Sequence, residues 1–265
     1  MKWSKRKFKL IACDVDGTLV PEGKYDLDPR FYEIFDLMQK KEILFSFVSG
    51  RQYSDLITLA PELIQEIIYI AANGSVVIEK DKIIAEIPLT QPDPQLICHD
   101  IIQFDDTDYF VSTVNNLYVN PRDPEIRDWL SEEPNVIFID QIKDIGKIED
   151  QIIKVSLQSN HKDGVEKYFS YFKDKWGHLC RVERSGFGWI DFNNSDKGTA
   201  LSKLSALKNF TMEDVMAFGD NSNDQTMLKL AGFSAAMSAS HPEVQADADI
   251  VLDDPYQFLL DYLKN

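Results

Sequence analysis

Short apolar segments alternate with polar turns along the chain, and several have the length of buried strands. Three of them, residues 8–13, 43–48 and 215–218, are largely apolar and lead into turns that contain glycine. Apolar runs of this length are typical of parallel strands that are covered on both faces. We therefore expect these three segments to lie in one parallel sheet.

Helical periodicity separates the first two predicted strands. An Asp-Pro pair at residues 28–29 is a common helix start, and apolar side chains then recur at intervals of three and four. These side chains are Phe31, Ile34, Phe35 and Met38. Near the other end of the chain a helix is expected from Lys197, with Leu201, Leu204 and Leu207 on its apolar face. A last strand at residues 249–252 and a helix at 256–263 complete this pattern of alternating strands and helices.

The middle of the chain has a different pattern. Alternating stretches at residues 109–114, 136–139 and 152–157 predict strands, and residues 165–172 have the period of an amphipathic helix. Its aromatic stripe is interpreted as the core of that region: Tyr168, Phe169, Tyr171, Phe172 and Trp176. We expect an α/β protein with a Rossmann-like parallel sheet core in residues 1–84 and 191–265, and an inserted α/β cap domain in residues 85–190.

Two aspartates follow the first predicted strand. Asp14 and Asp16 are one residue apart, and Gly17 permits a tight turn after them. Ligands of open α/β sheets bind at the carboxyl ends of the strands, and two carboxylates this close repel unless one is protonated or both share a cation. The segment therefore indicates a site for Mg²⁺ and a phosphoryl group, with a plain polar turn as the alternative.

Polar residues also follow the other two strands. Ser49 and Gly50 stand at a strand-to-helix turn, which presents backbone N–H groups to an anion. A second acidic cluster occupies residues 219–224, although these residues could also cap the next helix. Lys197 opens a helix, where the macrodipole disfavours a cation, so a local partner is expected.

In this order the segments resemble the four motifs of the haloacid dehalogenase (HAD) superfamily of phosphohydrolases. The motifs are matched by residues 14–18, Ser49, Lys197 and residues 219–224. The long separation of Ser49 from Lys197 resembles the Cof-type, or HAD-IIB, branch of sugar-phosphate phosphatases, which carries a large C2-type cap there. Residues 236–239 depart from the usual loop of the family, whereas all four motifs are intact.

The resemblance implies a role for each motif residue. Asp14 would attack phosphorus and form an aspartyl-phosphate, and Asp16 would protonate the leaving group and then deprotonate water. The implied phosphate-binding residues are Ser49, Gly50, Lys197 and Asn223. The implied ligands of the cofactor, Mg²⁺, are Asp14, Asp16 through its backbone carbonyl, Asp220 and Asp224, of which Asp224 would hold metal-bound water or orient Lys197.

The sequence thus predicts a Mg²⁺-dependent phosphohydrolase that acts on a small phosphorylated metabolite such as a sugar phosphate. Alternatives are a phosphomutase or phosphotransferase, a phospho-acceptor signalling domain, which Asp16 disfavours, and a silent metabolite-binding regulator, which the intact motifs disfavour. Leaving-group recognition is expected in the cap, since a lid can exclude water and contact the substrate. Its candidates are Arg122, Arg181, Arg184 and Tyr118, each with a solvated or cap-internal role as the alternative.

Composition narrows the partners and the compartment. The chain has 265 residues and a net formal charge of −16, so nucleic acid is not an expected partner. Three cysteines without paired spacing disfavour a disulfide framework or a structural zinc site and favour a reducing cytoplasm. Apolar runs fall short of the ~20 residues of a membrane span, and the basic residues 1–7 lead into a strand rather than the apolar part of a signal peptide. A monomer or small homo-oligomer is expected.

Overall fold

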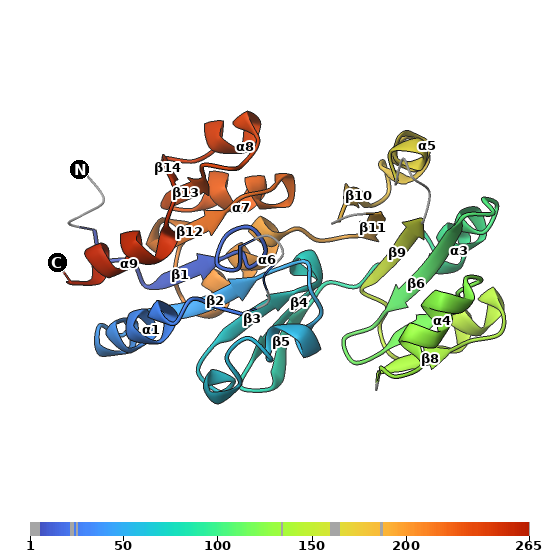
Figure 1. Cartoon of the computed structure of the whole chain (residues 1–265), viewed down its shortest axis with the longest axis horizontal. Helices are drawn as coiled ribbons and strands as arrows, with labels where there is room; N and C mark the ends of the chain where they lie inside the picture. Colours follow the sequence, from blue (N-terminus) through green and yellow to red (C-terminus); the bar gives the residue numbers. More distant parts are fainter. Residues whose placement is uncertain are drawn as a thin grey trace. The chain divides into compact units, whose positions relative to one another are not determined.

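The computed structural model describes residues 6–21, 24, 26–133, 135–159, 165–185 and 188–264. The chain forms two compact units, drawn in Figure 1. The core unit comprises Met1–Glu86 and Asp196–Asn265, and the cap unit comprises Ile87–Ser195. Residues 1–5 of the basic amino terminus lie outside the described residues.

An eight-stranded sheet forms the centre of the core unit. In sheet order the strands are β14 (Ile250–Leu252), β13 (Phe233–Met237), β12 (Val215–Gly219), β1 (Leu10–Cys13), β2 (Leu44–Val48), β3 (Ile68–Ala71), β4 (Val76–Glu79) and β5 (Lys82–Glu86). The strands from β14 to β3 are parallel, and β4 and β5 add an antiparallel hairpin at one edge. The expected Rossmann-like parallel sheet is confirmed, with the three apolar segments at β1, β2 and β12.

Helices cover both faces of this sheet. They are α1 (Arg30–Lys40), α2 (Tyr53–Leu56), α6 (Lys197–Leu207), α7 (Gln225–Leu230), α8 (Pro242–Ala246) and α9 (Pro255–Lys264), with 3₁₀ turns η2 (Pro61–Leu63), η3 (Ala72–Gly74), η5 (Met212–Asp214) and η6 (Ser222–Asp224). On one face Phe31 of α1 packs on Phe45 and Phe47 of β2, with ring centroids 5.2 and 5.6 Å apart. On the other, α6 and α7 pack on alternate residues of β1 and β3. The prediction that Leu207 lies on the apolar face of α6 is wrong, because this side chain is 52% exposed at the last turn of the helix.

A second sheet of six strands forms the cap unit. Its order is β10 (Arg181–Arg184), β11 (Trp189–Asn193), β9 (Lys154–Ser159), β6 (Thr107–Ser112), β7 (Leu117–Val119) and β8 (Val136–Phe138). All neighbours are antiparallel except β7 and β8. The accompanying helices are α3 (Pro94–Ile101), α4 (Pro124–Leu130), the 3₁₀ helix η4 (Ile142–Lys147) and α5 (Glu166–Trp176). In α5, Tyr168 and Phe172 are buried, whereas Tyr171 is exposed and is not a core residue.

The units divide close to the expected boundaries of 84/85 and 190/191, with two differences. Strand β5 continues to Glu86 because it completes the hairpin with β4. Strand β11 pairs antiparallel with β9 and β10, so residues 191–195 belong to the cap unit rather than to the core. All three cysteines are buried and free. In the part of the chain that the structure describes, no helix is both long and apolar enough to span a membrane.

Candidate active site

The acidic residues of the core unit follow two strands that pair with each other. Asp14 comes directly after β1 and Asp220 directly after β12, and Cys13 lies opposite Phe218 in the parallel ladder. The backbone N–H of Asp14 donates to the carbonyl of Phe218 at 2.9 Å, which extends the ladder by one residue. Because parallel strands end at the same edge of the sheet, both carboxylates reach one place.

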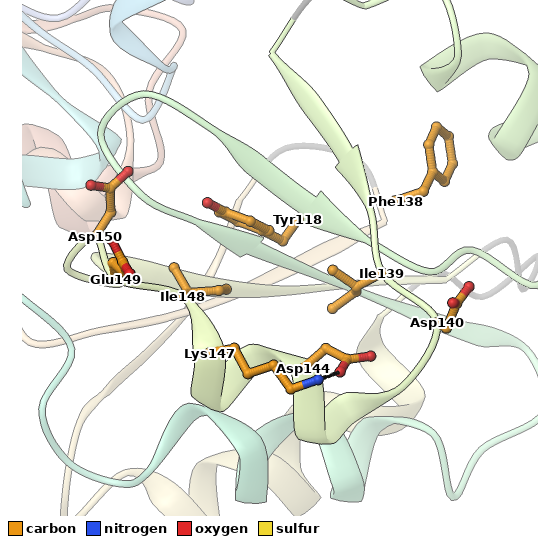
Figure 2. Close-up of a pocket in the computed structure, with 9 residues that line it drawn as sticks. All are labelled: Tyr118, Phe138, Ile139, Asp140, Asp144, Lys147, Ile148, Glu149 and Asp150. Atoms are coloured by element: carbon orange, nitrogen blue, oxygen red, sulfur yellow. Dashed lines mark hydrogen bonds and ion pairs between the residues drawn. The ribbon is translucent and has the colours of Figure 1, made fainter.

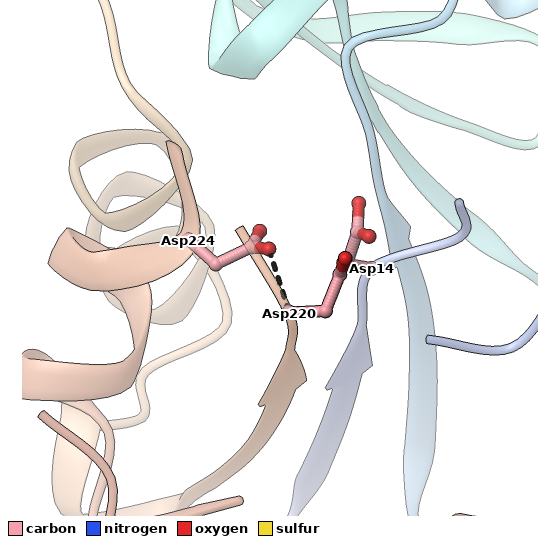
Figure 3. Close-up of side chains that lie close together, drawn as sticks. All are labelled: Asp14, Asp220 and Asp224. Carbon is pink, nitrogen blue, oxygen red and sulfur yellow. Dashed lines mark hydrogen bonds between the residues drawn. The ribbon is translucent and has the colours of Figure 1, made fainter. Parts of the chain in front are cut away.

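Three carboxylates gather at this edge (Figure 3). Oxygen atoms of Asp14, Asp220 and Asp224 lie within 4.8 Å of one another. Thr18 Oγ1 donates to Asp220 Oδ1 at 3.2 Å. Gly17 has a φ of +83°, and a Cβ atom at this position would collide with the Asp220 carboxylate. Glycine is therefore needed both for the turn and for the space beside the cluster.

Lys197 is a buried cation against this cluster. Its side chain is 1% exposed, and Nζ donates to Asp14 Oδ1 and to Asp224 Oδ1, each at 2.6 Å. Lys197 is the first residue of α6, whose N-cap is Asp196. The two carboxylates supply the expected local reason for a lysine at a helix start, because they outweigh the unfavourable end of the helix dipole.

Asp224 connects Lys197 to the loop that follows β12. Its Oδ2 accepts hydrogen bonds from the backbone N–H groups of Asp220 and Asn221, each at 3.0 Å. With the side chain of Asn221 it also forms the capping box of η6. Asp224 therefore caps the 3₁₀ turn η6 rather than the following helix α7, to which its side chain makes no cap bond, and it fixes the loop that carries Asp220. Its role in a site stays a prediction.

Negative charge exceeds positive charge in this buried cluster. Burial raises the pKa of Asp14, the charge of Asp224 raises it further, and Lys197 opposes both. The pKa of Asp220 is also raised, first by burial and then by Asp224. Burial alone would lower the pKa of Lys197, but Asp14 and Asp224 hold it above its usual value, so the ammonium stays charged at neutral pH. One ammonium cannot balance three carboxylates, whereas an added divalent cation would.

Asp16 lies outside this group of three carboxylates. Its oxygens accept two hydrogen bonds from Arg51, from Nε at 2.9 Å to Oδ2 and from Nη2 to Oδ1. The side chain of Asp16 is 57% exposed and that of Arg51 only 23%. This bidentate pair fixes the orientation of the Asp16 carboxylate. Its expected contact with Mg²⁺ through the backbone carbonyl stays a prediction.

Residues expected to bind phosphate follow the neighbouring strands. Ser49 is buried at the end of β2, and its Oγ accepts from the backbone N–H of Arg51 at 3.1 Å, which leaves its own hydroxyl proton to donate. Asn223 Nδ2 donates to Asn73 Oδ1 at 3.0 Å, and Asn73 N–H donates to the carbonyl of Ser49 at 3.0 Å. Gly50 is in the same group, because a Cβ there would lie 3.0 Å from Asn73 Oδ1.

Asn73, Arg51 and Thr18 are not among the site residues that the sequence predicts, and the structure places all three in contact with residues that are. A signal exists for Asn73: an Asn-Gly pair directly after a buried strand favours a left-handed residue, and Asn73 has a φ of 54°. For Arg51 the sequence indicates only a cationic side chain in a predicted turn. Its pairing with Asp16 depends on the adjacency of β1 and β2, which local sequence does not reveal.

The four leaving-group candidates lie in the cap unit. Arg181 pairs with Glu183 at 2.7 Å and Arg184 with Glu166. Arg122 donates to the Asp108 carboxylate and to the carbonyl of Phe104. Tyr118 is partly buried against the cap core. Cap-internal contacts therefore account for these side chains, as the alternative interpretation expected, and contact with a leaving group stays a prediction.

Three features define a HAD-type hydrolase. The sheet of the core unit is largely parallel, a buried lysine lies among carboxylates at its strand ends, and an α/β unit is inserted between β5 and α6. The model of the haloacid dehalogenase-like hydrolase family matches residues 11–257, and the chain belongs to this family. The expected superfamily is thereby confirmed.

Similar proteins span nearly the whole chain. The 5-amino-6-(5-phospho-D-ribitylamino)uracil phosphatase YbjI of Escherichia coli (strain K12) is 26% identical over 261 residues, which cover 91% of this chain and 89% of that protein. A crystal structure of a protein from Eubacterium rectale superposes with a TM-score of 0.83 at 30% identity and covers 97% of this chain and 98% of that one. The HAD subclass IIB sugar phosphatase BT4131 has the same fold, with a TM-score of 0.79 at 18% identity and coverage of 96% and 98%. The predicted HAD core with its inserted cap is confirmed.

Proposed function

We propose that this chain is a Mg²⁺-dependent phosphomonoesterase that hydrolyses small phosphorylated metabolites, sugar phosphates or similar compounds, through an aspartyl-phosphate on Asp14. The observation that carries the proposal is the buried cluster of Asp14, Asp220 and Asp224 around Lys197 at the carboxyl ends of β1 and β12. The membership of the chain in a hydrolase family and its similarity to a named phosphatase support it.

The donor set fits Mg²⁺. Three carboxylates offer the hard oxygen ligands that this ion prefers, and their uncompensated charge favours a divalent cation over water. Asp14, Asp220, Asp224 and the backbone carbonyl of Asp16 would hold it. When bound, Mg²⁺ supplies neutralisation of the charge on the phosphoryl oxygens.

Asp14 is the proposed nucleophile. Lys197 bonds one of its oxygens, Oδ1, and so orients the carboxylate while the other oxygen can attack phosphorus. Attack forms the Asp14 O–P bond as the bond from phosphorus to the leaving oxygen breaks. Lys197 remains protonated throughout and stabilises the negative charge that accumulates.

Asp16 is the proposed acid and base. It would donate a proton to the leaving oxygen and then take a proton from the water that hydrolyses the aspartyl-phosphate, which restores Asp14 and releases phosphate. Arg51 donates to both oxygens of Asp16, so this pair must open at one oxygen before Asp16 can carry the proton that the leaving group takes. Asp16 also argues against a phospho-acceptor signalling domain, since such a domain needs no acid and base for turnover.

Phosphoryl oxygens need donors as well as a cation. The Ser49 hydroxyl, the backbone N–H of Gly50, the Asn223 amide and Lys197 are the proposed set. Asn73 aligns two of them, since it bonds both the Asn223 amide and the Ser49 carbonyl. These local donors matter in a chain with a net charge of −16, whose mean field repels anionic substrates.

Phosphate release tests the proposal. Wild type and Asp14→Asn are incubated with a panel of sugar phosphates and other phosphorylated metabolites, each with Mg²⁺ and with EDTA, and free phosphate and organic products are both measured. We expect release that needs Mg²⁺ and Asp14. An isomer formed without free phosphate would indicate the phosphomutase instead, and no product across the panel would refute both.

A further inference from the structure

The cap unit contains a cavity of about 530 Å³ that the phosphatase chemistry does not use. It lies between the end of α3, the β6 and β7 strands and the start of η4. Its walls carry three basic side chains, His99, Arg122 and Lys143, and one carboxylate, Asp140. Ile102 and Ile142 supply apolar surface. All the lining residues belong to the cap unit, and none belongs to the aspartate cluster.

A buried hydroxyl group lines this cavity. Tyr109 on β6 is 2% exposed, and its hydroxyl proton has no acceptor among the described residues, although the Asn120 side chain donates to the hydroxyl oxygen. Burial raises the pKa of this phenol to about 12, so it stays protonated and able to donate. A buried donor without an acceptor costs free energy, and a ligand oxygen in the cavity would supply that acceptor.

Two cations of the cavity are available to an anion. Arg122 is anchored by Nε and Nη2, which bond Asp108 and the carbonyl of Phe104, while its Nη1 donates to no group in the described chain. Lys143 is exposed on η4 and forms no ion pair with any carboxylate that the structure describes. An anchored guanidinium next to a free ammonium is suited to a carboxylate or a phosphate.

A neighbouring cavity provides the contrast (Figure 2). It lies beside η4, shares Asp140 with the first cavity and is lined by four carboxylates: Asp140, Asp144, Glu149 and Asp150. Its one lysine, Lys147, is neutralised by Asp144 at 2.6 Å. The two lysines of η4 therefore differ: Lys147 completes an ion pair, whereas Lys143 faces a cavity with an excess of basic groups.

We propose that the cavity lined by Tyr109, Arg122 and Lys143 is an accessory binding site for a small organic anion. The anionic group, a carboxylate or a phosphate, is held by Arg122 Nη1 and Lys143. An oxygen of the ligand accepts the hydrogen bond of the Tyr109 hydroxyl, and Ile102 and Ile142 contact its apolar part. Binding there requires neither Mg²⁺ nor Asp14, so it can be tested separately from the phosphatase.

The location of binding is tested with the full chain labelled with 3-fluorotyrosine. Phenylphosphonate and benzoate share an apolar ring and differ in the anionic group, and benzyl alcohol is the neutral control. The ¹⁹F resonance of Tyr109 is identified as the one that is missing from Tyr109→Phe. In EDTA we expect one or both anions to shift this resonance in a saturable way, and we expect no shift with benzyl alcohol. Whichever anion acts identifies the preferred group. No shift with either anion, or an equal shift with benzyl alcohol, would overturn the proposal.

Matched variants then test the contacts by calorimetric titration with the active anion. Lys143→Gln should weaken binding about fivefold, the usual worth of one charge-assisted contact, whereas Lys147→Gln should leave it unchanged. Tyr109→Phe should also weaken binding, yet leave the unfolding midpoint of the free protein nearly unchanged, because it removes a buried donor without an acceptor together with the hydrogen bond from Asn120. Equal affinity of wild type and Lys143→Gln, or a marked loss of stability in Tyr109→Phe, would contradict the assignment.

Discussion

Each unit of the molecule buries a lysine, and the two lysines have different surroundings. In the cap, Lys154 pairs with Asp191 at 3.1 Å, and Ser156 donates to the same carboxylate at 2.6 Å. In the core, Lys197 faces Asp14 and Asp224 directly, with Asp220 beside them. Among the described residues, Lys154 has one carboxylate partner, whereas three carboxylates gather beside Lys197.

This difference separates a structural pair from a site. A balanced pair within an antiparallel ladder, such as Lys154 and Asp191, requires nothing further. An unbalanced cluster at the carboxyl ends of parallel strands favours protonation of a carboxylate or a bound cation, and that edge of the sheet is where ligands bind. Buried charge alone therefore does not indicate catalysis, but an excess of buried charge at strand ends does.

The largest effect is expected from Lys197→Met. Phosphate release should fall by about a thousandfold or more, because Asp14 loses its partner and the transferred group loses a cation. In EDTA the unfolding free energy should fall by about 3 kcal/mol or more, since the carboxylates are left uncompensated. Urea unfolding measures this, and Mg²⁺ should restore part of the loss. The control is Lys208→Met, whose partly exposed pair with Glu79 contributes at most about 1 kcal/mol.

Lys154→Met is the corresponding change in the cap. It removes the ammonium that pairs with the buried Asp191 carboxylate, so the unfolding free energy should fall by about 3 kcal/mol. The comparison predicts that this loss is the same in Mg²⁺ and in EDTA. If Mg²⁺ reduced the loss of unfolding free energy in Lys154→Met, the stability of the cap pair would also depend on the cation. The distinction between the two units would then be wrong.

Asp16→Asn should separate proton transfer from phosphoryl attack. Hydrolysis of a sugar phosphate should slow by about a hundredfold, because its leaving alkoxide needs a proton. Hydrolysis of p-nitrophenyl phosphate should slow much less at the first step, since its leaving group is stable as an anion. Burst kinetics would show the aspartyl-phosphate accumulating. Equal slowing of the first step for both substrates would remove the acid role from Asp16.

The smallest effect is a pH dependence of stability. The pKa values of Asp14 and Asp220 are raised in the folded protein, so the folded state binds more protons than the unfolded state above about pH 4. The unfolding free energy in EDTA should therefore fall as the pH rises through this range, by about 1 kcal/mol per pH unit for each proton. With Mg²⁺ the slope should be smaller. A slope in EDTA that equals the slope in Mg²⁺ would count against the charge excess.

Much of the core could be predicted because its signals are local. The apolar runs that became β1, β2 and β12 each end in a polar motif, and parallel strands necessarily bring those ends together. The apolar face of α1 is equally local, and all four of its predicted residues are buried.

The remaining features depend on contacts between distant segments. Asn73 joins the site through its bonds to Asn223 and Ser49, and Arg51 through its bonds to Asp16, which only the order of the strands creates. Residues 191–195 extend the cap unit beyond its expected end, because β11 pairs with β9, which lies well before it in the sequence. Local sequence patterns do not predict which distant segments pair with each other.

The central claim is that three carboxylates around one lysine create the requirement for a divalent cation. Its most direct test is the rate of phosphate release as a function of Mg²⁺ concentration for the wild type and Asp220→Asn. The account predicts no release in EDTA, saturable activation of the wild type, and half-saturation at a Mg²⁺ concentration about tenfold or more higher in Asp220→Asn, because one charged ligand is lost. Full activity in EDTA, or the same half-saturation in both proteins, would contradict it.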